Sequence, residues 1–144
     1  MKISILGSGG WGTALAVLSA NCNHETVLWG KFANEIDEIK RTHENPLLKR
    51  VEIPKNILLT SDINDIKSSD IVIIATPSFA VKETAKMLKD VIAEETVVVS
   101  VSKGFETDTL KRFTQVIKDE LPNNDVAALS GPSHAEEVGR KIPT

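Results

Sequence analysis

Three glycines near the start of the chain, at positions 7, 9 and 12, restrict the fold more than any other feature of the sequence. They follow a strand-like apolar run, residues 2–6, and precede an apolar stretch that is expected to form a helix over residues 13–22. Their spacing, G-x-G-x-x-G, is typical of a turn that joins a parallel strand to a helix and cradles a pyrophosphate. The beginning of the chain therefore predicts a strand–turn–helix unit that binds a dinucleotide.

Each glycine is expected to have its own role in that turn. Gly7 allows a tight exit from the strand, Gly9 lets backbone approach the pyrophosphate, and Gly12 lets the helix lie against the sheet. The helix would direct its N-terminal N–H groups and about half a unit of positive charge toward the phosphates. The alternative is a glycine-rich turn that serves the backbone alone.

Short apolar runs alternate with amphipathic stretches along the chain, which is typical of a parallel sheet with helices on both faces. Residues 70–75 form an uninterrupted run rich in Ile and Val, which predicts a strand near the centre, buried on both faces. Pro77 ends this strand and opens an amphipathic helix whose apolar stripe reaches Ile92. We also expect strands at residues 26–29, 57–60, 96–101 and 126–129, helices at 33–40 and 110–121, and a loop at 41–55.

The predicted fold class is α/β, a Rossmann-type doubly wound sheet, with residues 1–144 forming one dinucleotide-binding domain. The length of 144 residues suits a single domain, and 41% hydrophobic and 26% charged residues are ordinary for a globular protein. A net charge of −3 gives no basic excess, so we expect no nucleic-acid partner.

The sequence also predicts where the protein resides. No apolar run approaches the roughly 18 residues of a membrane span, and Met1 leads directly into the first strand, so we expect neither a span nor a signal peptide. The single cysteine, Cys22, cannot form a disulfide within the chain and is expected to be a small buried hydrophobe. A reducing cytoplasm is the expected compartment.

Ligands bind at the carboxyl ends of the strands in an open α/β sheet, so the residues after each strand are the candidate site. Gly30 and Lys31 follow the second predicted strand, where an NAD-selective protein usually has Asp or Glu for the ribose 2′-hydroxyl. With no carboxylate to repel a 2′-phosphate and a lysine able to pair with it, NADP is at least as acceptable as NAD. The alternative is a solvated surface lysine.

Similar turns follow the later strands. Ser78 is expected mainly to stabilise the turn that it occupies. Lys103, beside Gly104 at a strand end, suits charge pairing with a phosphorylated substrate, with a surface lysine as the alternative. Residues 130–137 give a second Gly/Ser turn before a helix, which is either an anion cradle or a capping box that begins at Ser133.

These motifs together resemble the first part of the bacterial NAD(P)-dependent glycerol-3-phosphate dehydrogenases. The resemblance covers the whole chain, and its most specific part is the combination of the lysine–glycine and glycine–proline–serine turns at this separation. It rests on the glycine turn with Trp11, Leu28-Trp29, Asn56-Ile57 before Thr60-Ser61-Asp62, Ser102-Lys103-Gly104, and Ser130-Gly131-Pro132-Ser133 ending in Ile142-Pro143-Thr144.

The resemblance implies an oxidoreductase that uses NAD or NADP to interconvert sn-glycerol 3-phosphate and dihydroxyacetone phosphate for glycerophospholipid synthesis. It implies a small phosphorylated substrate as partner and a homodimer for the full-length protein. It assigns Gly131 and Ser133 to the substrate, and Lys103 to both substrate and cofactor. The other cofactor contacts that it implies, besides the glycine turn, are Gly10, Trp11, Lys31 and Ala135.

The chain departs from the family pattern at three places. The family often has Ser at the position of Gly10, an aromatic residue at that of His134, and a Leu-Pro-Gly-like turn where residues 50–54 stand. His134, like the other histidines, His24 and His43, is expected on the surface, and none shares a metal-ligand spacing with Cys22, so we predict no metal.

Family members continue into a helical substrate domain that supplies a lysine as general base. This chain offers a cationic Lys103 and hydroxyls without a paired base, so we expect no catalytic residue here and interpret the chain as a cofactor-binding fragment. Two alternatives remain open from the residues: another Rossmann dehydrogenase of the 6-phosphogluconate or hydroxyacid type, and a non-enzymatic nucleotide-sensing module.

Overall fold

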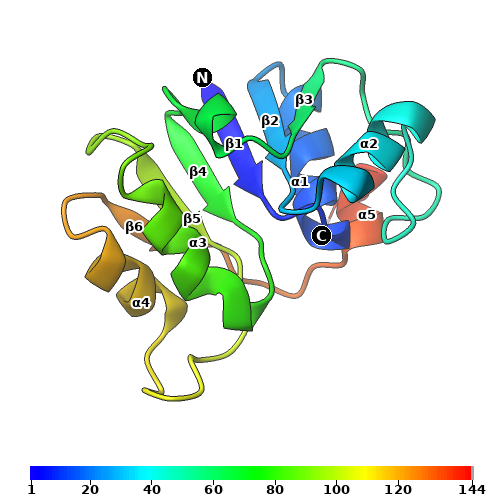
Figure 1. The fold of residues 1–144 in the computed structure, drawn as a ribbon. Helices are drawn as coiled ribbons and strands as arrows, with labels where there is room; N and C mark the ends of the chain where they lie inside the picture. Colours follow the sequence, from blue (N-terminus) through cyan, green and yellow to red (C-terminus); the bar gives the residue numbers. More distant parts are fainter. Residues whose placement is uncertain (144) are drawn as a thin grey trace.

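Six parallel strands form one sheet in the order β3-β2-β1-β4-β5-β6 (Figure 1). The computed structural model describes residues 1–143. The chain starts at the centre, moves outward to β3, crosses back to β4 beside β1, and moves outward again to β6. This is the doubly wound order of a Rossmann fold, which confirms the predicted fold class. The strands are β1 (Lys2–Leu6), β2 (Glu25–Trp29), β3 (Ile57–Thr60), β4 (Ile71–Ile74), β5 (Val97–Ser100) and β6 (Val126–Ala128).

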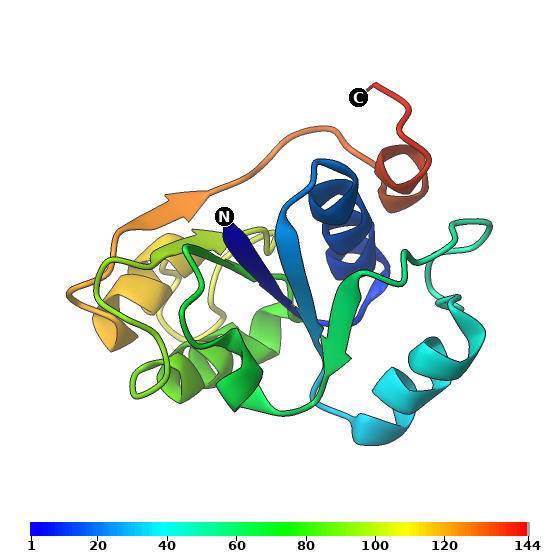
Figure 2. The ribbon, with the colours of Figure 1, turned by 90° about the horizontal axis from the view of Figure 1, so that it is seen from above.

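Helices cover both faces of the sheet (Figure 2). On one face lie α1 (Gly10–Asn21) and α5 (Ala135–Gly139), with α2 (Ala33–Thr42) beside β3 and its Ile36 and Ile39 in the same core. The other face carries α3 (Val81–Leu88) and α4 (Phe113–Glu120). Two short 3-10 helices, η1 (Ile63–Ile66) and η2 (Ser78–Ala80), precede β4 and α3.

Each face of the sheet has its own hydrophobic core. Ile5 and Leu6, consecutive in β1, point into opposite cores, and both are completely buried. The same alternation in β4 buries Ile74 completely, whereas Ile73 is half-buried on the face of α1. The prediction that the residue 70–75 strand is central is confirmed, but its burial on both faces is incomplete. On this face α1 and α2 contact β1, β2 and β3, so β4 is less fully covered there.

Several element boundaries differ from the sequence prediction. The first helix begins at Gly10 rather than residue 13, because the Gly9 carbonyl already accepts a bond from the N–H of Thr13 at 2.9 Å. α4 begins at Phe113 rather than residue 110, because Leu110 has a φ of +56°, which a helix does not accommodate.

Two further expectations are corrected. The helix after Pro77 starts as η2 and ends at Leu88, so Ile92 packs against the core from the loop beyond it. Cys22, expected to be buried, is exposed at the end of α1. Within residues 1–143, the structure has no helix with both the length and the apolar character needed to cross a membrane.

Candidate functional site

Two of the three fingerprint glycines are required by the packing of the chain itself. Gly7 has a φ of +126°, and a Cβ there would lie 2.6 Å from the carbonyl oxygen of Ala75. A Cβ at Gly12 would overlap the carbonyl oxygen of Gly7, so only glycine lets α1 start so close to β1. The structural roles predicted for Gly7 and Gly12 are confirmed.

Gly9 lies in a different environment. A Cβ at Gly9 would meet no atom within 4 Å, and its φ of −69° is accessible to every residue type. Neither packing nor backbone conformation therefore requires glycine at this position. Gly9 lines the large pocket described below, so the open space beside it is available to a bound group.

The loop between α2 and β3 packs against the glycine turn, and its Leu47 also lines the pocket described below. The Asn45 side chain is buried, and its Nδ2 donates to the carbonyl of Ser8 at 2.8 Å and to the hydroxyl of Thr13 at 2.7 Å. A Cβ at Gly10 would overlap the carbonyl oxygen of Leu47 from the same loop. The loop is thus fitted to a glycine at the position where the resembled family often has Ser.

A cavity of about 1550 Å³ runs along the carboxyl ends of the strands. The cavity is larger than the usual range for a drug-sized ligand, so it has room for an extended cofactor and a second small molecule. Its walls come from the turns that follow five of the strands: Gly7 to Trp11 after β1, Lys31 and Phe32 after β2, Ala75 to Ala80 after β4, Val101 to Phe105 after β5, and Leu129 to Ala135 after β6.

The structure brings nearly all of the predicted site residues to this cavity. Only Gly12 is absent from its lining, because it is buried between the turn and the sheet. The residues from the sequence prediction that line the cavity are Gly7, Gly9, Gly10, Trp11, Lys31, Lys103, Gly131, Ser133 and Ala135.

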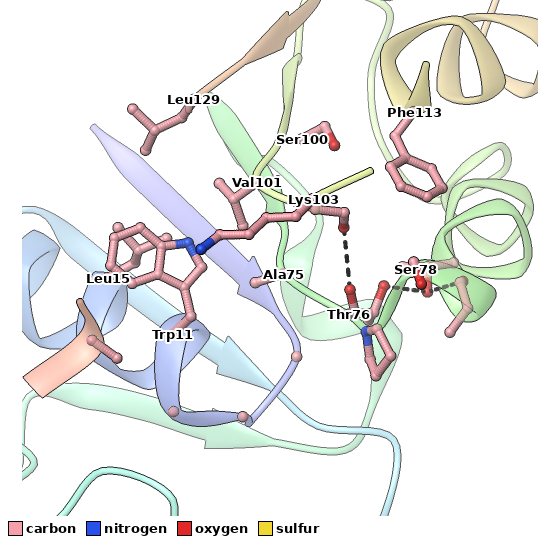
Figure 3. Close-up of a pocket in the computed structure, with 18 of the residues that line it drawn as sticks. Trp11, Leu15, Ala75, Thr76, Ser78, Ser100, Val101, Lys103, Phe113 and Leu129 are labelled. Carbon is pink, nitrogen blue, oxygen red and sulfur yellow. Dashed lines mark hydrogen bonds between the residues drawn. The ribbon is translucent and has the colours of Figure 1, made fainter. Parts of the chain in front are cut away.

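Two lysines, Lys31 and Lys103, and one arginine, Arg112, carry positive charge in the cavity lining. Figure 3 shows Lys103 extending from the turn after β5 toward Trp11 of α1. Among residues 1–143, neither Lys103 nor Lys31 has a carboxylate oxygen within 4.0 Å of its ammonium group. Both ammonium groups are therefore available to an anionic ligand.

Hydroxyl groups also line the cavity, among them those of Thr76, Ser78, Ser102 and Ser133. Ser102 donates from its Oγ to the carbonyl of Thr76 at 3.2 Å, which joins the ends of β5 and β4 (Figure 3). The turn-stabilising bond expected of Ser78 and the capping box expected of Ser133 do not form, since neither hydroxyl has a hydrogen-bond partner in the described part of the chain. His134, not Ser133, is the N-cap of α5.

The turn after β6 resembles the glycine turn in one respect. A Cβ at Gly131 would meet no atom within 4 Å, so the packing of the described chain does not require glycine there either. Gly104, by contrast, has a φ of +91° and is required by its own backbone. The two glycines that the chain's packing leaves unexplained, Gly9 and Gly131, both line the cavity.

Sequence analysis missed three charged residues that line the cavity, Glu35, Glu83 and Arg112. Glu35, in the first turn of α2, lines it at the same end as Lys31. The expectation that this end has no carboxylate was therefore wrong. Glu35 does not follow the strand directly, because α2 begins at Ala33 and presents its first turn to the cavity. Its signal in the sequence is an acidic residue in the first turn of the following helix.

Comparisons with known proteins agree with this geometry. The family described as NAD-dependent glycerol-3-phosphate dehydrogenase N-terminus matches residues 2–144. The NAD(P)+ glycerol-3-phosphate dehydrogenase of Thermoanaerobacter sp. is 48% identical over 145 residues, which cover 100% of this chain and 44% of that protein.

Solved structures give the same result. A crystal structure of glycerol-3-phosphate dehydrogenase from Coxiella burnetii superposes with a TM-score of 0.90 at 30% identity, over 99% of this chain and 44% of that one. The enzyme from Saccharomyces cerevisiae gives a TM-score of 0.84 at 26% identity, over 98% and 44% of the two chains. The chain thus spans less than half the length of these relatives. With the family match extending over residues 2–144, the chain belongs to the NAD-dependent glycerol-3-phosphate dehydrogenase family and corresponds to its N-terminal part.

Proposed function

We propose that residues 1–144 form the cofactor-binding domain of an NAD(P)-dependent glycerol-3-phosphate dehydrogenase. The observation that carries the proposal is Gly9, whose missing side chain leaves space in the cavity that no atom of the described chain fills. The pyrophosphate of NAD or NADP occupies the open space beside Gly9, where the backbone N–H groups of Gly9, Gly10 and Trp11 bind it, assisted by the N-terminus of α1. Lys31 pairs with the 2′-phosphate when NADP is bound.

The other end of the cavity binds the substrate, a small phosphorylated molecule. Lys103 pairs with dihydroxyacetone phosphate and with the cofactor, and Gly131 and Ser133 contact the substrate through backbone and hydroxyl groups. The free Lys103 ammonium, the unpaired Ser133 hydroxyl and the open space at Gly131 support this assignment. Ala135 completes the cofactor contacts.

The bound nicotinamide supplies the hydride chemistry, and the residues of this domain hold and orient its two reactants. Reduction of the ketone also needs a proton donor, and the reverse reaction needs a base. Lys103 is a cation that serves the substrate phosphate, so we assign the general base to the part of the family's length that lies beyond this domain. We further propose a homodimer of the full-length protein, acting in the cytoplasm in glycerophospholipid synthesis.

Replacing Gly9 with valine tests the proposal. Because the space beside Gly9 is open, Gly9→Val should fold with an unchanged melting temperature, but its side chain would occupy the place of the pyrophosphate. Calorimetry should show at least a tenfold loss of affinity for both NADH and NADPH, as expected when about 1.4 kcal/mol or more of binding is lost. Ala127→Val, which adds similar bulk on exposed β6 outside the cavity, is the control. Equal affinity of wild type and a folded Gly9→Val would reject the site.

A further inference from the structure

Two side chains of opposite charge line the same end of the cavity. Lys31 follows β2 directly, and Glu35 lies in the first turn of α2, with the exposed ring of Phe32 between them in sequence. The two side chains have neither a hydrogen-bond partner nor an ion-pair partner within residues 1–143. Each charge is therefore available to a molecule in the cavity.

The other acidic residues of α2, Asp37 and Glu38, differ from Glu35 because each has an ion-pair partner and neither lines the cavity. Asp37 pairs with Lys40 at 3.8 Å, and Glu38 accepts from Arg41 at 2.6 Å. The hydrogen bond from Arg41 holds the pKa of Glu38 below its ordinary value. Glu35 is thus the acidic residue of α2 that is both unpaired and directed to the ligand site.

A carboxylate and an ammonium group recognise different forms of the adenosine ribose. A carboxylate accepts a hydrogen bond from a 2′-hydroxyl, and it repels a 2′-phosphate. An ammonium group attracts the 2′-phosphate and gains little from the neutral hydroxyl. Proteins that select NAD place an acidic residue at this ribose, and proteins that select NADP place a cation there.

We propose that Glu35 is the cofactor-selecting carboxylate of this domain and that it acts against Lys31. Glu35 accepts a hydrogen bond from the 2′-hydroxyl of NAD, whereas Lys31 pairs with the 2′-phosphate of NADP. Because the two charges oppose each other at one ribose, neither cofactor is excluded, and the domain binds both. This inference rests on the proposed function, because it requires a dinucleotide in the cavity.

Calorimetric titration of the 144-residue chain with NADH and with NADPH tests the assignment. Glu35→Ala should weaken NADH about tenfold, the typical loss when a hydrogen bond to a charged acceptor is removed, and should tighten NADPH about threefold. Lys31→Met should weaken NADPH about tenfold and change NADH by less than about threefold. The Glu35 substitution therefore moves the ratio of the two affinities by about thirtyfold toward NADPH.

Glu38→Ala is the matched control, because it removes the same charge from the same helix outside the cavity. It should leave both affinities within about twofold of wild type, since its charge is exposed and screened. Glu35 also lies in the first turn of α2, where a carboxylate stabilises a helix. If Glu35→Ala lowers only the melting temperature, or changes both affinities in parallel, the selector role is wrong. A wild-type chain that binds neither cofactor would instead reject the proposed function itself.

Discussion

The ammonium group of Lys82 on α3 lies 3.9 Å from the carboxylate of Glu106, in the loop that follows β5. The Glu106 side chain is only 17% exposed and also accepts a hydrogen bond from the hydroxyl of Thr109. Its backbone N–H donates to the carbonyl of Lys111 at 2.9 Å. Lys103 lies in the same loop, three residues before Glu106, so we expect the contacts of Glu106 to help hold the turn that carries Lys103.

Glu106→Ala should therefore weaken substrate binding, although Glu106 itself is not a substrate contact. In a protein of the family's full length, we expect KM for dihydroxyacetone phosphate to rise about five- to tenfold with a smaller change in kcat, because the loop loses its anchor. Asp119→Asn, which breaks the exposed ion pair with Lys111 at 2.7 Å, is the control and should leave KM unchanged. A Glu106→Ala protein with wild-type KM would show that the loop is held by its backbone alone.

Lys103 should be needed for turnover but not for folding. In a protein of the family's full length, Lys103→Ala should lower kcat/KM for dihydroxyacetone phosphate by on the order of a hundredfold if Lys103 orients the substrate as proposed. Because Lys103 is exposed, its loss should leave folding intact. The isolated 144-residue chain should oxidise NADPH negligibly with the same substrate. The loss of NADPH absorbance measures both. Robust turnover by the isolated chain would place the general base within these residues.

Gly10→Ser should destabilise this protein, although Ser often stands at this position in the resembled family. A Cβ at Gly10 would overlap the Leu47 carbonyl, which is backbone and can yield only if the whole loop shifts. We expect the free energy of unfolding to fall by about 1–3 kcal/mol, the usual cost of overpacking. Urea unfolding measures it, with Ser8→Ala as a substitution in the same turn. An unchanged midpoint for Gly10→Ser would mean that the loop is free to move away.

Asp62 should contribute to acid sensitivity. The backbone N–H and side-chain amide of Asn64 donate to its carboxylate, which lowers the pKa of Asp62 in the folded chain. A lowered folded-state pKa stabilises the protein above the unfolded-state pKa, and this contribution is lost as pH falls through the folded-state value. Asp62→Asn keeps an acceptor for the cap but cannot titrate. Its melting temperature should fall less steeply than that of wild type between pH 7 and about pH 3. Identical slopes would contradict the assignment.

The fold could be predicted because its signals are local. The glycine spacing and the apolar runs specify each strand and helix within a few residues, and the doubly wound order then follows from right-handed parallel crossovers. The boundary at Leu110 could not be predicted, since a positive φ at leucine has no sequence signature.

The site was predictable only where it follows the strands directly. Lys31, Lys103 and Ser133 are found by that rule, and all three line the cavity. Asn45 is not found by that rule, because its amide donates a hydrogen bond to the carbonyl of Ser8, 37 residues away in sequence, and this contact exists only in the folded chain. Residues on a supporting loop depend on tertiary contacts that periodicity does not encode.

The segment after β6 leads to α5, which lies beside α1 (Figure 2). Residues of both helices line the same cavity. Domains generally fold as units. The turn with Gly9 and the wall at Gly131 to Ala135 are therefore expected to form in the same folding event. The cavity then takes its shape only when α5 has docked on α1.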